Sequence, residues 1–155
     1  MKVSKNKTDK ATAYAYRLFG IRPRSERELK QRLFGKHYDH ETISGVISSL
    51  KEKDIIDDVE FARRWIESRR RTNPKGDRLL RKELREKGVS ATVIDTVLAE
   101  KKESENSVVR ALAGKKAESL KNLPKQKARK KLFDFLARRG FDFDVIGEAV
   151  NEAFG

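Results

Sequence analysis

The same spacing of leucines occurs at three places along the chain. Leucines four positions apart open the segments LKQRLFGKHY (Leu29–Tyr38), LRKELREKGV (Leu80–Val89) and LFDFLARRGF (Leu132–Phe141). Residues four apart lie on one face of an α-helix, so each segment predicts a helix with one apolar face. Gly88 and Gly140 follow the last turn of two of these helices, and glycine is a common residue at that position.

A second amphipathic helix is predicted directly after each of these segments. Asp39, Ser90 and Asp142 have side chains that cap helix N-termini well. Each is followed by apolar residues on one helical face, namely Ile43, Val46 and Ile47, then Ile94, Val97 and Leu98, then Ile146, Ala149 and Val150. Successive copies are shifted by 51 and 52 positions, which indicates an internal repeat of about 50 residues.

A further helix is predicted ahead of each pair, in residues 11–20 (ATAYAYRLFG), 57–71 (DDVEFARRWIESRRR) and 106–121. Ser25 with Glu28, and Asp57 with Glu60, have the spacing of a capping box at a helix start. We therefore read Asp57 and Asp58 as residues that begin a helix, in preference to a pair of catalytic carboxylates.

These patterns predict an all-α protein with nine helices and no strands. The helices form three consecutive three-helix units, in residues 11–56, 57–102 and 103–155. A unit of this size buries little apolar surface alone, so we expect neighbouring units to stack into an elongated, curved array. Residues 1–10 (MKVSKNKTDK) have no helical periodicity and are expected to form a basic, disordered arm.

The charge is segregated along the chain. The formal net charge is +13, distributed as +8 over residues 1–38, −5 over 39–60, +7 over 61–88, 0 over 89–120, +7 over 121–140 and −4 over 141–155. Such segregation predicts a positive face that attracts a polyanion or an acidic protein surface.

Few residues in the chain are suited to catalysis or to metal binding. There is no cysteine, and the two histidines, His37 and His40, flank Asp39 at a predicted break between helices with no zinc-site spacing. No glycine-rich phosphate loop or nucleophile motif is present. We therefore expect no enzymatic activity, no cofactor and no metal. No apolar run approaches the ~20 residues of a membrane span, so we expect a cytoplasmic protein.

The basic residues that lie off the apolar stripes are the best candidates for binding a partner. The apolar faces place Phe61, Trp65, Phe133 and Phe135 in the core. The candidate contact residues are Arg69, Arg70, Arg78, Arg81, Lys82 and Arg85 in the central unit, extended by Arg129, Lys130 and Arg138 in the third unit. Guanidinium groups repeated at the spacing of the units suit a periodic anionic surface, such as nucleic acid or a protein filament.

Three segments resemble the signature segments of the RecX family of regulatory proteins. They are RSERELKQRL (Arg24–Leu33), IIDDVEFARRWIESR (Ile55–Arg69) and GDRLLRKELREKGV (Gly76–Val89), in the order and spacing typical of that family. The first unit departs from the family pattern at Lys36-His37, where Lys-Gly is usual, and the third unit matches mainly through its helix pattern.

This resemblance implies a bacterial cytoplasmic modulator of the RecA recombinase, with no enzymatic activity of its own. Family members are built from tandem three-helix repeats and lie in the groove of the RecA–DNA filament. There they typically inhibit strand exchange, ATP hydrolysis and co-protease activity during DNA repair and the SOS response. The nine basic residues named above would then contact the filament, and the protein would act as a monomer.

Two other functions are compatible with the same sequence. The basic face could bind DNA directly, as in a general nucleic-acid-binding protein, and binding to naked DNA would then depend steeply on salt. Alternatively, the chain could be a helical adaptor whose basic face meets an acidic protein without DNA. Base-specific recognition is not expected, because the third helix of the units is acidic where a recognition helix would be basic.

Overall fold

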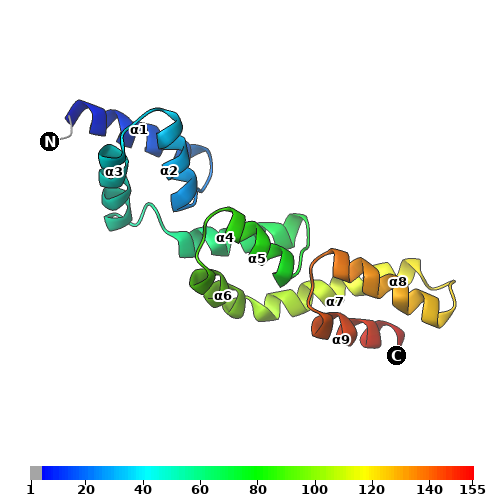
Figure 1. Ribbon diagram of the computed structural model, residues 1–155. Coiled ribbons are helices and arrows are strands. Elements are labelled where there is room, and N and C mark those ends of the chain that lie inside the picture. The colour runs from blue at the N-terminus through cyan, green and yellow to red at the C-terminus, as the bar shows by residue number, and fades with distance from the viewer. Residues whose placement is uncertain (1–4) are drawn as a thin grey trace.

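The computed structural model describes residues 5–155, and all regular structure in this range is helical. The nine helices are α1 (Lys5–Ile21), α2 (Glu26–Gly35), α3 (His40–Glu52), α4 (Asp58–Thr72), α5 (Asp77–Glu86), α6 (Ala91–Glu100), α7 (Lys102–Ser119), α8 (Lys125–Arg138) and α9 (Phe143–Phe154). They form three consecutive three-helix units in an elongated row (Figure 1). The predicted all-α fold of three tandem units is confirmed.

The first helix begins earlier than predicted. Lys5–Lys10 form the first turns of α1, and Ala11 and Ala15 further along that helix are fully buried. The expectation of a disordered arm is therefore wrong for residues 5–10. Lys7 also bonds to the carboxylate of Asp39 at 3.4 Å, which ties this turn to the start of α3. Residues 1–4 of the predicted arm lie outside the described residues.

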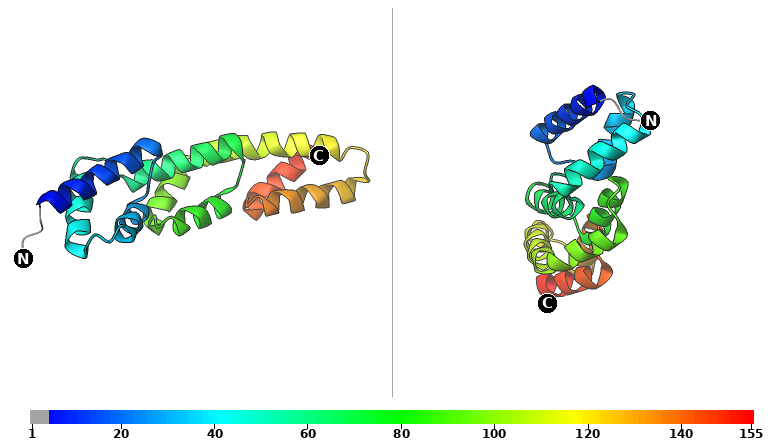
Figure 2. Two further views of the ribbon diagram at one scale, coloured as in Figure 1. Left: turned by 90° about the horizontal axis from the view of Figure 1, so that it is seen from above. Right: turned by 90° about the vertical axis from the view of Figure 1, so that its left-hand side faces the viewer.

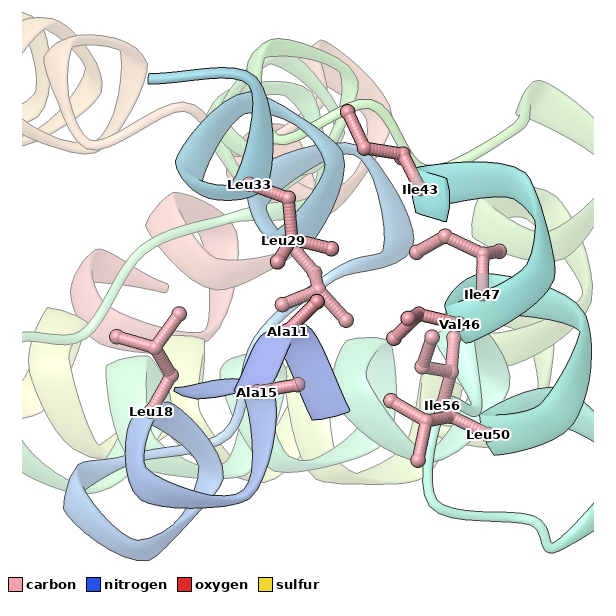
Figure 3. Close-up of a cluster of buried hydrophobic side chains, with 10 residues drawn as sticks. All are labelled: Ala11, Ala15, Leu18, Leu29, Leu33, Ile43, Val46, Ile47, Leu50 and Ile56. Carbon is pink, nitrogen blue, oxygen red and sulfur yellow. The ribbon is translucent and has the colours of Figure 1, made fainter. Parts of the chain in front are cut away.

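Each unit has its own apolar core. In the first unit, side chains from α1, α2 and α3, together with Ile56, point toward one another (Figure 3). The second and third units repeat this arrangement. The leucine pairs that define the repeat are fully buried at Leu29, Leu33, Leu80, Leu84, Leu132 and Leu136. Burying six such side chains stabilises the fold by about 1.5–3 kcal/mol each.

The aromatic residues predicted for the core are buried to different extents. Phe61 is buried and stacks on Trp65 at 5.9 Å between ring centroids. Trp65, Phe133 and Phe135 are only partly buried, because they pack at the edges of the second and third cores. The core prediction holds for Phe61 and is too strong for the other three.

The helix ends match the sequence signals. Ser25 and Glu28 make a complete capping box at the start of α2. Asp57 caps α4 by accepting the N–H groups of Val59 at 3.0 Å and Glu60 at 3.2 Å. Gly88 and Gly140 have positive φ angles of 86° and 88°, the left-handed conformation expected after a helix.

The second helices of the units, α2, α5 and α8, follow one another end to end along one side of the molecule (Figure 2). The N-terminus of α2 meets the C-terminal end of α5, and the N-terminus of α5 meets the C-terminal end of α8. Gly76 N–H donates to the carbonyl of Arg139 at 2.9 Å, and Arg78 N–H donates to the carbonyl of Gly140 at 3.0 Å. At the first junction, the Ser25 hydroxyl donates to the carbonyl of Lys87 at 2.6 Å. Free N–H groups at one helix end thus satisfy free carbonyls at another.

Each junction is completed by an arginine and a carboxylate. Arg27 donates to the carbonyl of Glu86, and the equivalent Arg78 donates to that of Ala137 at 2.6 Å. The first N–H of α2, from Glu26, bonds to Asp58 at 3.0 Å.

The first N–H of α5, from Asp77, likewise bonds to Glu105 at 2.9 Å. Asp58 therefore does more than begin its own helix. Like Glu105, it holds its own unit to the preceding unit through a helix N-terminus.

Candidate interaction surface

Arg70 is not on the surface. Its side chain is 3% exposed, and its guanidinium donates to the Asp77 carboxylate and to the carbonyl of Lys101, both at 2.7 Å. It therefore joins the end of α4 to the start of α5 and to the residue between α6 and α7. The expectation that Arg70 lies on the surface that meets a partner is wrong, because its side chain is buried and both terminal nitrogens of its guanidinium bond within the chain.

Asp77 and Glu105 form the acidic half of the same network. Burial, reinforced by the neighbouring Glu105 carboxylate, raises the pKa of Asp77 to about 7. The pKa of Glu105 is lowered: burial opposes the shift, but hydrogen bonds from Asp77 and Lys102 outweigh it. The pair thus divides into one carboxyl that binds a proton readily and one that stays ionised. Together with Arg70 these groups stabilise the joint between the second and third units.

Arg69 lies beside Trp65 and Glu83. Its guanidinium carbon is 4.5 Å from the Trp65 ring centroid, and its Nε is 3.5 Å from the Glu83 carboxylate. Glu83 also accepts from Lys75 at 2.8 Å and from the Trp65 indole N–H at 3.3 Å. The side chain of Arg69 is one-third exposed, and its charge is largely balanced within its own unit.

Three more of the predicted contact residues have internal partners. Arg78 is exposed but bonds to the carbonyl of Ala137 across the junction. Arg81 pairs with Asp95 at 3.2 Å, between α5 and α6. Arg129 donates to the Asn151 side chain at 2.6 Å, between α8 and α9. A partner that binds these guanidinium groups must share them with the bonds they already make.

The remaining four candidates are exposed and carry no ion pair within residues 5–155. They are Lys82 and Arg85 on α5, and Lys130 and Arg138 on α8. Since α5 and α8 lie end to end, these side chains recur along the same row of helices (Figure 2). We refer to these four residues as the α5–α8 cations.

A second basic group was missed by the sequence prediction. Arg17, Arg24, Arg32 and Lys36 lie in the first unit around Tyr14 and are called here the Tyr14 cluster. The Arg17 guanidinium and the Lys36 amine are 5.7 Å and 5.5 Å from the Tyr14 ring centroid. Arg24 is 6% exposed, and this burial is the main cause that lowers its pKa; Arg32 lowers the pKa further, whereas Tyr14 raises it. The net charge of +8 over residues 1–38 was the available signal.

The histidine-flanked aspartate has a structural role. Asp39 caps α3 by accepting the N–H of Thr42 at 2.7 Å, and the pKa of Asp39 is lowered by its interaction with the side chain of Thr42 and then with this N–H. Within the described residues, no three His, Asp or Glu side chains come close enough together to hold a metal ion. None of the helices from α1 to α9 has the length and apolar character needed to cross a membrane.

The fold and the exposed cations define a class of protein: a helical-repeat protein with a basic surface. The models of the first, second and third three-helix domains of RecX match residues 11–50, 57–98 and 103–150. A Chlorobium limicola protein named Regulatory protein RecX is 37% identical over 147 residues, which cover 94% of this chain and 91% of that one. The chain belongs to the RecX family.

Other comparisons agree with this assignment. The Regulatory protein RecX of Amycolatopsis mediterranei is 35% identical over 148 residues, covering 92% of this chain and 85% of the relative. The crystal structure of RecX from Lactobacillus salivarius superposes with a TM-score of 0.90 at 20% identity, covering 97% and 98% of the two chains. The shared name describes a regulatory protein and not an enzyme.

Proposed function

We propose that this protein binds the RecA–DNA filament in its groove and inhibits the recombinase, ATPase and co-protease activities of RecA. RecX relatives cover nearly the whole chain, and their printed name is that of a regulatory protein. A RecA regulator acts where DNA is repaired and recombined, so we also propose a cytoplasmic location. No cofactor is required by this function.

One observation supports the filament as the target more than any other. The α5–α8 cations recur on helices that lie end to end, so the row presents charge at intervals along its length. A helical filament presents the same acidic group once per protomer. Weak contacts at successive protomers add up, because linked units bind with a high effective concentration after the first has docked. A single globular acidic partner would use only part of the row.

The double variant Lys82→Glu/Arg85→Glu is expected to bind RecA filaments at least about tenfold more weakly, because two exposed, unpaired cations become repulsive. Co-sedimentation with filaments assembled on single-stranded DNA would measure this. The melting temperature should stay close to that of the parent chain, since both side chains are exposed and unpaired.

The matched control is Lys53→Glu/Lys115→Glu, which makes the same change in net charge away from the α5–α8 cations. These lysines are exposed and unpaired within residues 5–155. The control should bind filaments within about twofold of the parent chain. Equal losses in both double variants would show that only total charge matters, and would contradict the assignment of the binding surface.

A further inference from the structure

The Tyr14 cluster has a counterpart in the second unit. Tyr14 and Trp65 are 51 positions apart, as are Lys36 and Lys87. The Lys36 amine lies 5.5 Å from the Tyr14 ring centroid, and the Lys87 amine lies 5.4 Å from the Trp65 ring centroid. The two units therefore build the same arrangement, an aromatic ring on the first helix covered by a lysine that follows the second.

In the second unit a carboxylate sits at the centre of this arrangement. Glu83 accepts from the Trp65 indole at 3.3 Å and from Lys75 at 2.8 Å, and lies 3.5 Å from Arg69 Nε. Its side chain is 19% exposed. Glu83 thus balances the cations around the ring from within the chain.

In the first unit the central acid is replaced by a base. The positions equivalent to Glu83 and Lys75 are Arg32 and Arg24. Arg24 is 6% exposed, and its buried Nε has no hydrogen-bond acceptor. None of Arg17, Arg24, Arg32 and Lys36 forms an ion pair with any residue from 5 to 155. The cations are present, but the carboxylate that balances them in the second unit is missing.

Glu28, the carboxylate that raises the pKa of Arg24, does not fill this gap. Glu28 accepts from Arg22 at 2.6 Å and from the Ser25 N–H at 3.3 Å, as part of the capping box. Burial is the main cause that lowers the pKa of Arg24, followed by repulsion from Arg22 and Arg32. A buried donor without an acceptor destabilises the free protein, and an anion that enters the cluster removes this cost.

We propose that the Tyr14 cluster is a docking site for an acidic side chain of a protein partner. The carboxylate would occupy the place relative to Tyr14 and Arg24 that Glu83 occupies relative to Trp65 and Lys75. This extends the proposed function by naming the chemical group that the first unit binds, and it assigns to that unit a contact separate from the α5–α8 cations.

The structure favours a carboxylate over a phosphodiester. The equivalent place in the second unit already holds a glutamate, so its dimensions suit a carboxylate on a side chain. Arg24 is almost fully buried, and a group at the tip of a flexible side chain reaches such a guanidinium more easily than a backbone phosphate flanked by sugars. The Arg17 guanidinium and the Lys36 amine already lie 5.7 Å and 5.5 Å from the Tyr14 ring centroid, so a base that stacked on this ring would compete with these cations.

The variant Arg32→Glu tests the proposal, because it places in the first unit the carboxylate that the second unit has. The internal acid should balance Arg24 and raise the melting temperature by about 2–4 °C. It should also weaken binding of a poly-glutamate peptide by about tenfold or more, measured by titration calorimetry with the full chain. Arg32→Gln removes the cation without adding the acid, so it should weaken binding less and should not raise the melting temperature.

Lys115→Glu is the control for net charge, because it makes the same change on the exposed face of α7. It should bind the peptide within about twofold of the parent chain. A parallel titration with poly-dT separates the two sources of anion. Unchanged peptide binding in Arg32→Glu, or a loss confined to poly-dT, would overturn the proposal. These titrations contain no recombinase, so their outcome is independent of whether the chain binds RecA filaments.

Discussion

Replacing Arg70 by alanine is expected to lower the free energy of unfolding by about 3–5 kcal/mol. The substitution removes both 2.7 Å hydrogen bonds of the guanidinium, to the Asp77 carboxylate and to the carbonyl of Lys101. Asp77 is 5% exposed and its pKa is already raised to about 7, so without Arg70 it would take up a proton at neutral pH. The cost then comes mainly from the two lost charge-assisted bonds, about 1.5–3 kcal/mol each. A loss of this size is a large part of the 5–15 kcal/mol that usually separates folded from unfolded domains.

The adjacent Arg71 provides the control. It is exposed at the end of the same helix and forms no ion pair with the residues that the structure describes. Arg71→Ala should therefore change the free energy of unfolding by no more than about 0.5 kcal/mol. Denaturant unfolding followed by circular dichroism measures both variants. If the two are equally stable, Arg70 does not hold the joint between the second and third units.

The second large effect is expected at Gly140. With a φ of 88°, an alanine at this position would adopt a left-handed conformation, which costs about 1–2 kcal/mol. Its Cβ would also lie 2.4 Å from Leu79 Cγ and 2.9 Å from the Leu79 backbone nitrogen. Overpacking of this kind adds about 1–3 kcal/mol. Gly140→Ala should therefore lower the free energy of unfolding by about 2–5 kcal/mol in a denaturant titration.

Gly88 and His37 occupy the same position in the other two units. Alanine substitutions there allow the cost at Gly140 to be compared between units. A Cβ at Gly88, where φ is 86°, would lie 2.6 Å from Arg27 Cβ, an atom that cannot move away without its backbone. Gly88→Ala should therefore cost about 2–5 kcal/mol, as at Gly140, from the left-handed conformation and the overpacking together. His37 already has a φ of 67° with a side chain, and it is exposed. His37→Ala should change stability by about 0.5 kcal/mol or less. If all three alanines cost the same, the contact between units does not explain why glycine is needed.

This comparison also explains the departure at Lys36-His37 from the family pattern. The glycine after the second helix is needed in the second and third units, because the preceding unit packs against it through Arg27 or Leu79. Nothing in residues 5–155 packs in the same way against His37. The glycines were predicted from helix ends alone, and their second role at the junctions needed the structure.

The repeat was readable from the sequence because it depends on local spacing. Pairs such as Leu80 and Leu84 fix the buried face of a helix, and the period of 51 to 52 residues fixes the order of units. The start of α1 was missed because Lys5–Lys10 is polar throughout, and an apolar stripe cannot mark such a turn. Its anchoring to Asp39 is a tertiary contact that the periodicity does not contain.

The error at Arg70 had a signal in the sequence. Ala62 and Ile66 are buried on α4, and Arg70 is the next residue at the same four-residue spacing. The helical spacing therefore places Arg70 on the buried face of α4, although its charge favours the surface. By contrast, the partners of Arg78 and Arg81 come from other helices, and helical phase alone does not reveal them. Comparison of Arg32 with Glu83 at a separation of 51 residues would have exposed the Tyr14 cluster.

The central claim is that the assembled RecA filament, and not DNA alone, is the target of this protein. It is tested most directly by titrating the chain onto single-stranded DNA, bare or coated with RecA and a slowly hydrolysed ATP analogue, at two salt concentrations. We expect the filament to be bound at least about tenfold more tightly than bare DNA at both concentrations. Equal affinity for bare DNA, falling steeply with salt, would contradict the claim and indicate a general nucleic-acid-binding protein.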